Sequence, residues 1–243
     1  MKNSLKFNST LSTKLVHWNE SQNCCLWKGV TCSEKGRVIG LNLFNESISG
    51  SLHNSSLFSL QYLENLNLAC NKLSSSLIPS QFGNLTNLIY LNLSNAGFEG
   101  QIPIEISQLT RLVTLDLSTS SLLSVSMLKI ENPDLAKLVW NFSELKELYL
   151  DGGLLIPPLS KLQSLSILLL IVIPLMLQFQ NFFKFHKFDV LHLSFCGLNG
   201  TFPEKVFQIL TLQTLDLSNN ELLQGALPDS LVTFNVVRID LSG

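Results

Sequence analysis

The chain has 243 residues, of which 46% are hydrophobic and 14% are charged, and its formal net charge is −2. This is the balance of a folded globular protein. It contains neither a basic stripe nor a block of like charge, so electrostatics give no reason to expect an anionic membrane or a nucleic acid as partner.

The chain begins with a mixture of apolar and polar residues that predicts one or two short amphipathic helices over residues 1–18. Their apolar side chains would cover the open end of the structure that follows: Leu5, Leu11, Leu15 and Trp18. The first unit of a stacked structure needs such a cover because its apolar face has no neighbour. We therefore expect residues 1–36 to form an N-terminal cap.

C-terminal to this segment, one pattern of apolar, Asn, Gly and Pro positions recurs along the chain. It is complete in LIYLNLSNAGFEGQIP (Leu88–Pro103) and LQTLDLSNNELLQGALP (Leu212–Pro228), and Leu91 and Leu115 are separated by 24 residues. A period of about 20 to 29 residues indicates leucine-rich repeats. Each LxL core predicts a short strand whose two leucines point into a shared core. The sequence thus predicts an α/β solenoid, a curved superhelix with parallel strands on its concave face.

The turn after each strand has its own signature. An Asn three places after the second Leu, as at Asn71 and Asn220, can hydrogen-bond backbone groups that strand pairing leaves unsatisfied, so the stack should contain an asparagine ladder. Cys196 takes this ladder position in its repeat, and we expect Cys196 and Cys70 to be buried thiols. The five cysteines contain no CxxC pair and predict no metal site.

The solenoid, of about nine partly irregular repeats, occupies residues 37–243. Strands are expected at Ile39–Leu43, Glu64–Leu68, Ile89–Leu93, Val113–Leu117, Lys146–Leu150, Ser166–Leu170, Val190–Leu193, Thr214–Leu217 and Val237–Leu241. Residues 126–148 predict a longer helical segment on the convex side. Within 167–189 the repeat vanishes, and the unbroken apolar run of eleven residues is too short for a membrane span. Two interpretations of this segment stay open. Either the protein has this sequence, or one-base changes in the gene sequence have shifted the reading frame across a normal repeat.

The most specific motif lies in the cap, where NCCLWKGVTC places Cys24, Cys25 and Cys32 around Trp27 and Gly29. It resembles the N-terminal cap of plant leucine-rich-repeat receptors. Further on, RVIGLNLFNESISG, YLNLSNAGFEGQIPIEISQLTRLVTLDLS and CGLNGTFPEKVFQ resemble plant receptor-like proteins of immunity, most closely the verticillium wilt resistance type. The resemblance implies a disulfide between Cys25 and Cys32. Cys24 is then expected to be unpaired, with burial as a free thiol or competition for Cys32 as the alternatives.

The same resemblance implies a cell-surface ectodomain that recognises a microbial protein or peptide and signals through receptor-kinase co-receptors. Intact family members are single-pass proteins of the plasma membrane, whereas this sequence shows neither a secretory signal nor a convincing transmembrane helix. Two alternatives remain open. One is a secreted inhibitor of microbial cell-wall hydrolases with the same fold, and the other is a non-functional truncated relic.

Candidate binding residues follow from the solenoid. Side chains that point outward from the strands would line the concave face, and those expected to contact a ligand are Tyr90, Asn92, Thr114, Asp116, Glu147, Tyr149, His192, Thr214 and Asp216. The histidines have no sequence neighbours that would form a catalytic triad or a metal site, and no phosphate-binding glycine loop occurs. We expect neither an enzyme nor a cofactor.

Eight Asn-x-Ser/Thr sequences are glycosylation candidates: Asn8, Asn19, Asn45, Asn54, Asn84, Asn92, Asn141 and Asn199. Secretion would make them available to glycosylation. Repeat words such as GNLT and LNLS generate such sequences automatically, so some of them are expected to be unused.

Overall fold

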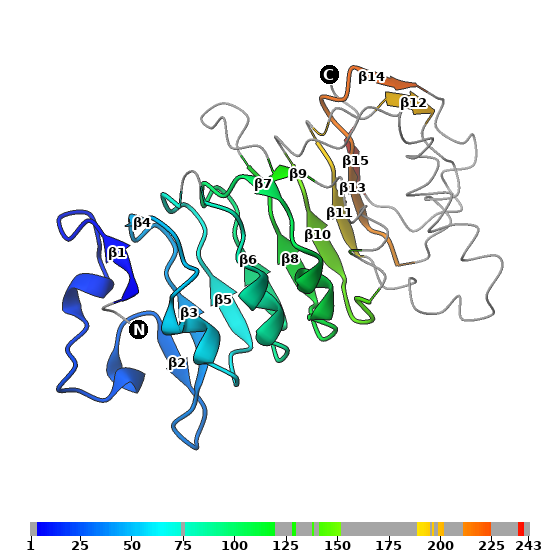
Figure 1. The fold of residues 1–243 in the computed structure, drawn as a ribbon. Coiled ribbons are helices and arrows are strands. Elements are labelled where there is room, and N and C mark those ends of the chain that lie inside the picture. Colours follow the sequence, from blue (N-terminus) through cyan, green and yellow to red (C-terminus); the bar gives the residue numbers. More distant parts are fainter. Residues whose placement is uncertain are drawn as a thin grey trace.

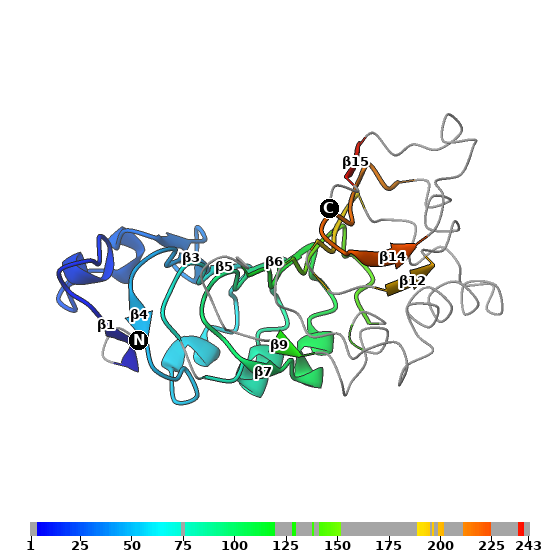
Figure 2. The same ribbon diagram turned by 90° about the horizontal axis from the view of Figure 1, so that it is seen from above.

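The computed structural model describes residues 4–73, 76–119, 128–129, 138, 141–151, 189–194, 196, 199–201, 211–224 and 238–240. In these residues the chain forms a solenoid (Figure 1). A nine-stranded sheet lines one side, and short 3-10 helices line the other (Figure 2).

Eight strands of this sheet, counted among the described residues, run parallel, each supplied by one turn of the solenoid. In chain order they are β3 (Val38–Asn42), β5 (Asn65–Asn67), β6 (Tyr90–Asn92), β8 (Thr114–Asp116), β10 (Glu147–Tyr149), β11 (Val190–His192), β13 (Thr214–Asp216) and β15 (Arg238–Asp240). Successive strands pair so that one leucine of each LxL motif stands beside the next, as Leu66, Leu91 and Leu115 do. These three leucines are fully buried. The predicted solenoid with its parallel strands is confirmed.

Strand β10 pairs directly with β11, so that Tyr149 stands beside His192. The sequence placed a strand at Ser166–Leu170 between them, and that segment lies outside the described residues. The N–H of Asp189 donates to the carbonyl of Lys146 at 2.9 Å, which occupies the backbone groups that an intervening strand would need. In the described sheet, no strand lies between β10 and β11.

The convex side carries three 3-10 helices in the described part of the chain: η4 (Ser56–Ser59), η5 (Ser80–Asn84) and η6 (Ile104–Gln108). Two short parallel pairs also form, β7 (Gly100–Gln101) with β9 (Leu128–Lys129) and β12 (Asn199–Thr201) with β14 (Leu222–Gln224). A longer helical segment was expected over residues 126–148. This prediction is wrong at β9, whose backbone pairs with β7, and it is confirmed at Leu138, which is α-helical. Much of the remainder lies outside the described residues.

The expected helical cap is confirmed only as short 3-10 helices, because no α-helix occurs among its described residues. Instead β1 (Lys6–Phe7) pairs with β4 (Ile48–Ser49), and η2 (Leu15–His17), η3 (Cys24–Leu26) and β2 (Val30–Cys32) follow. β2 joins the main sheet antiparallel to β3. Leu5, Leu15 and Trp18 are buried as expected, but Leu11 is 51% exposed.

The asparagine ladder is present. Asn71 Nδ2 donates to the carbonyls of Leu43 and Leu68 at 2.9 and 2.7 Å. Its Oδ1 accepts from the N–H of Glu46 at 3.2 Å. Asn220 bonds its own repeat and the preceding one in the same way. Each ladder amide therefore ties two consecutive turns of the solenoid together.

Cys196 fills one rung of this ladder as a buried thiol, as predicted, and its Sγ donates to the carbonyl of Leu150 at 3.3 Å. Burial first, and then the carboxylates of Asp151 and Asp216, raise the pKa of the Cys196 thiol far above its ordinary value. The prediction of burial is wrong for Cys70, which is only half-buried. It occupies a left-handed turn position with φ 56° immediately before the ladder residue.

Candidate functional site

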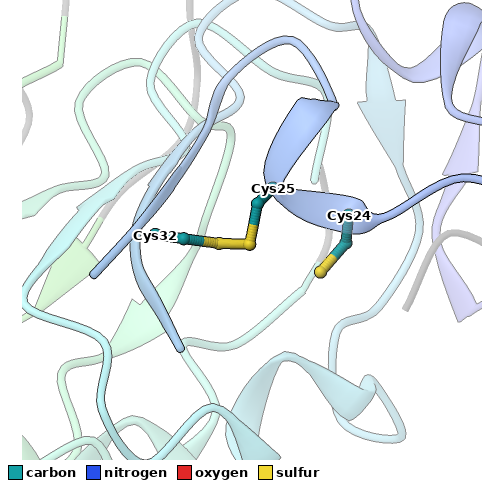
Figure 3. A group of neighbouring side chains, drawn as sticks. All are labelled: Cys24, Cys25 and Cys32. Carbon is teal, nitrogen blue, oxygen red and sulfur yellow. A yellow bond between two sulfur atoms is a disulfide. The ribbon is translucent and has the colours of Figure 1, made fainter. Parts of the chain in front are cut away.

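The cap motif forms a compact junction with the first repeat. Cys25 and Cys32 form a disulfide with an S–S distance of 2.05 Å, while the half-buried Cys24 is a free thiol beside them (Figure 3). Gly29 has φ 87°, and a side chain there would collide with the carbonyl of Asn42. The glycine of the motif therefore lets the cap backbone lie against β3.

The two cap tryptophans stack on one another. The ring centroids of Trp18 and Trp27 are 4.8 Å apart with an interplanar angle of 20°. Both indole N–H groups donate to cap carbonyls, Trp18 to that of Lys28 and Trp27 to that of Asn19, each at 3.0 Å. Burial of the aromatic faces with satisfied N–H groups explains why the motif needs tryptophan at these positions.

Glu46, which the sequence did not single out, joins this cap to the solenoid. It is fully buried at the ladder position of the first repeat, three residues after Leu43. Its carboxylate accepts hydrogen bonds from the N–H groups of Thr13 and Lys14 at 3.0 and 2.9 Å. Spacing alone could have found it, because a carboxylate stands at the position that Asn71 and Asn220 hold in their repeats.

Outward side chains on the concave face form a column in register across the strands. In strand order it contains Asn42, Asn67, Asn92, Asp116, Tyr149, His192 and Asp216. The side-chain oxygens of Asn92, Asp116 and Asp216 accept the backbone N–H two residues further on, at 2.9, 3.0 and 3.0 Å. These Asx turns close the ends of the strands, so three of the nine binding candidates also have a structural role.

Tyr149 and His192 interrupt this column. Their rings are in contact, with centroids 5.0 Å apart and an edge-to-face arrangement. His192 cannot accept the N–H of Ser194 as an Asx residue would, and Asp151 from the preceding turn accepts it instead at 2.8 Å. At His192 the end of the strand is therefore closed by Asp151 and not by the column residue.

The surroundings of these rings are acidic. Burial raises the pKa of the Tyr149 phenol, and the nearby carboxylates of Glu147, Asp116 and Asp151 raise it further. The hydroxyl of Thr114 donates to Glu147 Oε2 at 2.9 Å, which orients that carboxylate along the sheet. A cationic or hydrogen-bond-donating ligand fits this surface better than an anionic one.

The remaining candidates extend the surface to both sides. Tyr90 borders a shallow hollow over β3 and β5, and its hydroxyl accepts from Asn92 Nδ2 at 3.1 Å. Thr214 is half-buried on β13 beside Val190. All nine candidates lie on the strands of the sheet and are half-buried. Whether a ligand contacts them stays a prediction.

The glycosylation candidates divide by position. Six are exposed, namely Asn8, Asn19, Asn45, Asn54, Asn84 and Asn141, and the side chain of Asn199 lies outside the described residues. Asn92 is half-buried on the concave face. Its amide nitrogen donates to Tyr90 and Asp116, the latter at 2.9 Å.

We therefore expect Asn92 to stay unmodified when the chain is secreted from a plant cell, because a glycan would break both bonds. Glycopeptide mass spectrometry should detect glycans on Asn54 and Asn84, which serve as internal controls. A glycan on most copies of Asn92 would contradict this expectation, because it would show that the two hydrogen bonds of the amide do not protect it.

Comparison with known proteins supports the repeat architecture. Residues 1–33 match the leucine rich repeat N-terminal domain, and residues 62–85, 87–109 and 211–234 match the Leucine Rich Repeat. The chain is 37% identical to Receptor-like protein 6 of Arabidopsis thaliana over 231 residues, covering 94% of this chain and 21% of that protein.

Two solved structures are also similar. The PEPR1–AtPEP1 structure matches with a TM-score of 0.58 and 25% identity, covering 93% of this chain and 31% of that chain. The BIR3–SERK2 complex from Arabidopsis thaliana matches with a TM-score of 0.51 and 30% identity, covering 61% of this chain and 76% of that chain.

The fold and its N-terminal motif define a leucine-rich-repeat protein with a disulfide-containing cap. The resemblance to plant leucine-rich-repeat receptor-like proteins is confirmed. It spans about a fifth of the length of the first curated relative, of which it covers 21%. Within the described residues, no helix has the length and apolar character needed to cross a bilayer.

Proposed function

We propose that this chain is the N-terminal part of the ligand-recognition ectodomain of a plant defence receptor-like protein. Its ligand is a microbial protein or peptide, which binds on the concave face. The chain acts as a binding module rather than an enzyme, and receptor kinases are its signalling partners at the plasma membrane.

The observation that carries this proposal is the interruption of the Asx column by Tyr149 and His192. An aromatic pair in a half-buried position, surrounded by carboxylates, has the character of a binding hot spot. A peptide ligand is supported by the similarity to the structure of the plant peptide hormone receptor RGFR1 in complex with RGF2, which matches with a TM-score of 0.56 and 26% identity. The BIR3–SERK2 complex supports a partner ectodomain of the same kind.

The proposal can be tested by capture. The secreted chain is immobilised, exposed to the culture filtrate of a plant-pathogenic fungus, and the retained peptides are identified by mass spectrometry. A Tyr149→Ala/His192→Ala double variant should lose at least about 90% of the retained ligand, since each hot-spot truncation costs about 2 kcal/mol.

The matched control is Ile104→Ala, which removes a 42% exposed apolar side chain from η6 on the convex side. It should retain the same peptides as the unmodified chain. If the double variant retains as much ligand as the unmodified chain, the binding site does not lie on β10 and β11. If the unmodified chain retains no peptide specifically, the proposed function is contradicted.

A further inference from the structure

Three side chains from consecutive turns of the described sheet converge beside Tyr149. Asp151 follows β10, His192 ends β11 and Asp216 ends β13. His192 Nδ1 lies 3.4 Å from Asp151 Oδ2 and 3.9 Å from Asp216 Oδ2. The three side chains are only 27%, 23% and 21% exposed for His192, Asp151 and Asp216 respectively.

We propose that Asp151, His192 and Asp216 bind one divalent transition-metal ion, with zinc as the preferred ion. All three ligand atoms lie within 4.8 Å of one another. Ligands at about 2.0–2.2 Å from a tetrahedral ion are about 3.3–3.6 Å apart, so small side-chain movements bring these atoms into coordination. Two carboxylates and a neutral imidazole supply two negative charges against the two positive charges of the ion.

The outer hydrogen bonds suit this role. Asp151 Oδ1 accepts from the N–H and hydroxyl of Ser194 at 2.8 and 2.9 Å. Asp216 Oδ1 accepts from the N–H of Ser218 at 3.0 Å. Each carboxylate is thus held through one oxygen while the other faces the imidazole, as the outer partners of metal-binding carboxylates do.

The donor set also selects the ion. Imidazole favours zinc and its transition-metal neighbours over magnesium or calcium, which take oxygen ligands. Three protein ligands leave a fourth position open. On the concave face that position is accessible to a carboxylate or an imidazole of a bound ligand.

One other group of potential metal ligands occurs in the described residues, formed by Cys24, Cys25 and Cys32. Two of these thiols are consumed by the disulfide. Zinc binding by the oxidised chain is therefore assigned to the Asp–His–Asp group, and experiments without reductant keep the two groups apart.

The test is calorimetric titration of the oxidised full chain with zinc chloride after removal of bound metal. We expect one equivalent to bind, and Asp216→Asn and His192→Gln each to weaken the affinity by about tenfold or more. Asp216→Asn keeps the oxygen that accepts from Ser218, so the turn is preserved. Asp116→Asn is the matched control, because it makes the same change two column positions away from His192.

The thermal unfolding midpoint of each variant is first measured without zinc. Only variants whose midpoint equals that of the unmodified chain are compared, so that a folding defect is not counted as lost binding. Cobalt(II) replaces zinc in a second titration, and its spectrum should show nitrogen and oxygen ligands. Absence of binding, affinity unchanged in both variants, or a thiolate-to-cobalt charge-transfer band would overturn the proposal.

Discussion

Glu46→Ala should destabilise the cap by about 3 kcal/mol, which is the usual cost of removing one partner from a buried charged hydrogen-bond group. The carboxylate is fully buried and accepts from Ser12 Oγ and Thr13 Oγ1 as well as from backbone N–H groups. Alanine leaves these donors without an acceptor inside the cap junction. Denaturant unfolding followed by tryptophan fluorescence measures the loss, since two of the three tryptophans lie in the cap.

The same carboxylate gives the cap a pH dependence. Burial alone would raise the pKa of Glu46, but hydrogen bonds from Ser12, Lys14 and other cap groups reverse this and leave the pKa below its ordinary value. A lowered pKa stabilises the fold above the unfolded value of about 4.3, and this contribution is lost as the pH falls through the folded value.

The control for both effects is the exposed Glu34, whose replacement by alanine should change the free energy of unfolding by less than about 0.5 kcal/mol. Cap stability of the unmodified chain should fall more steeply below about pH 4 than that of Glu46→Ala. Parallel pH profiles for the two chains would contradict the assigned role of Glu46.

Asn71→Ala should cost about 3 kcal/mol, because it removes one rung of the ladder from a buried turn. The change deletes the donors to Leu43 and Leu68, and it leaves the N–H groups of Glu46 and Ile48 without their acceptor. The two consecutive turns lose the side-chain hydrogen bonds between them, while the backbone pairing of β3 with β5 remains. Equilibrium unfolding by guanidinium chloride measures the effect.

Asn67→Ala is the matched comparison within the same repeat. Asn67 makes the single Asx bond to the N–H of Ala69 at 2.9 Å at the concave surface. Its loss should cost about 1 kcal/mol. Equal losses for the two variants would mean that the ladder amide has no special role in joining the turns.

The strand positions could be predicted because an LxL motif with apolar neighbours has one way to bury its leucines. The pairing of β10 with β11 was not predicted, since the leucine pattern at Ser166–Leu170 favoured a further strand between them. Asp151 was missed for the same reason. Its approach to His192 depends on that pairing, whereas His192 and Asp216 are one period of 24 residues apart.

The cap shows a different limit of prediction. Its apolar spacing favours an amphipathic helix, but the N–H groups of Thr13, Lys14 and Leu15 bond to Glu46 instead of to helical carbonyls. A single buried carboxylate from another part of the chain thus outweighs local helical preference. The Asx role of Asn92 was visible in principle, because Ser94 follows at the spacing of such turns.

Tyr149 and His192 lie side by side on the concave face. Their contact is measured most directly by nuclear Overhauser effects between tyrosine and histidine ring protons in an otherwise deuterated chain. The chain has only three tyrosines and four histidines, so Tyr149→Phe and His192→Gln assign the signals. Ring centroids 5.0 Å apart predict a cross-peak between these two residues. An intervening strand would separate them by roughly 10 Å and abolish it, which would contradict the site.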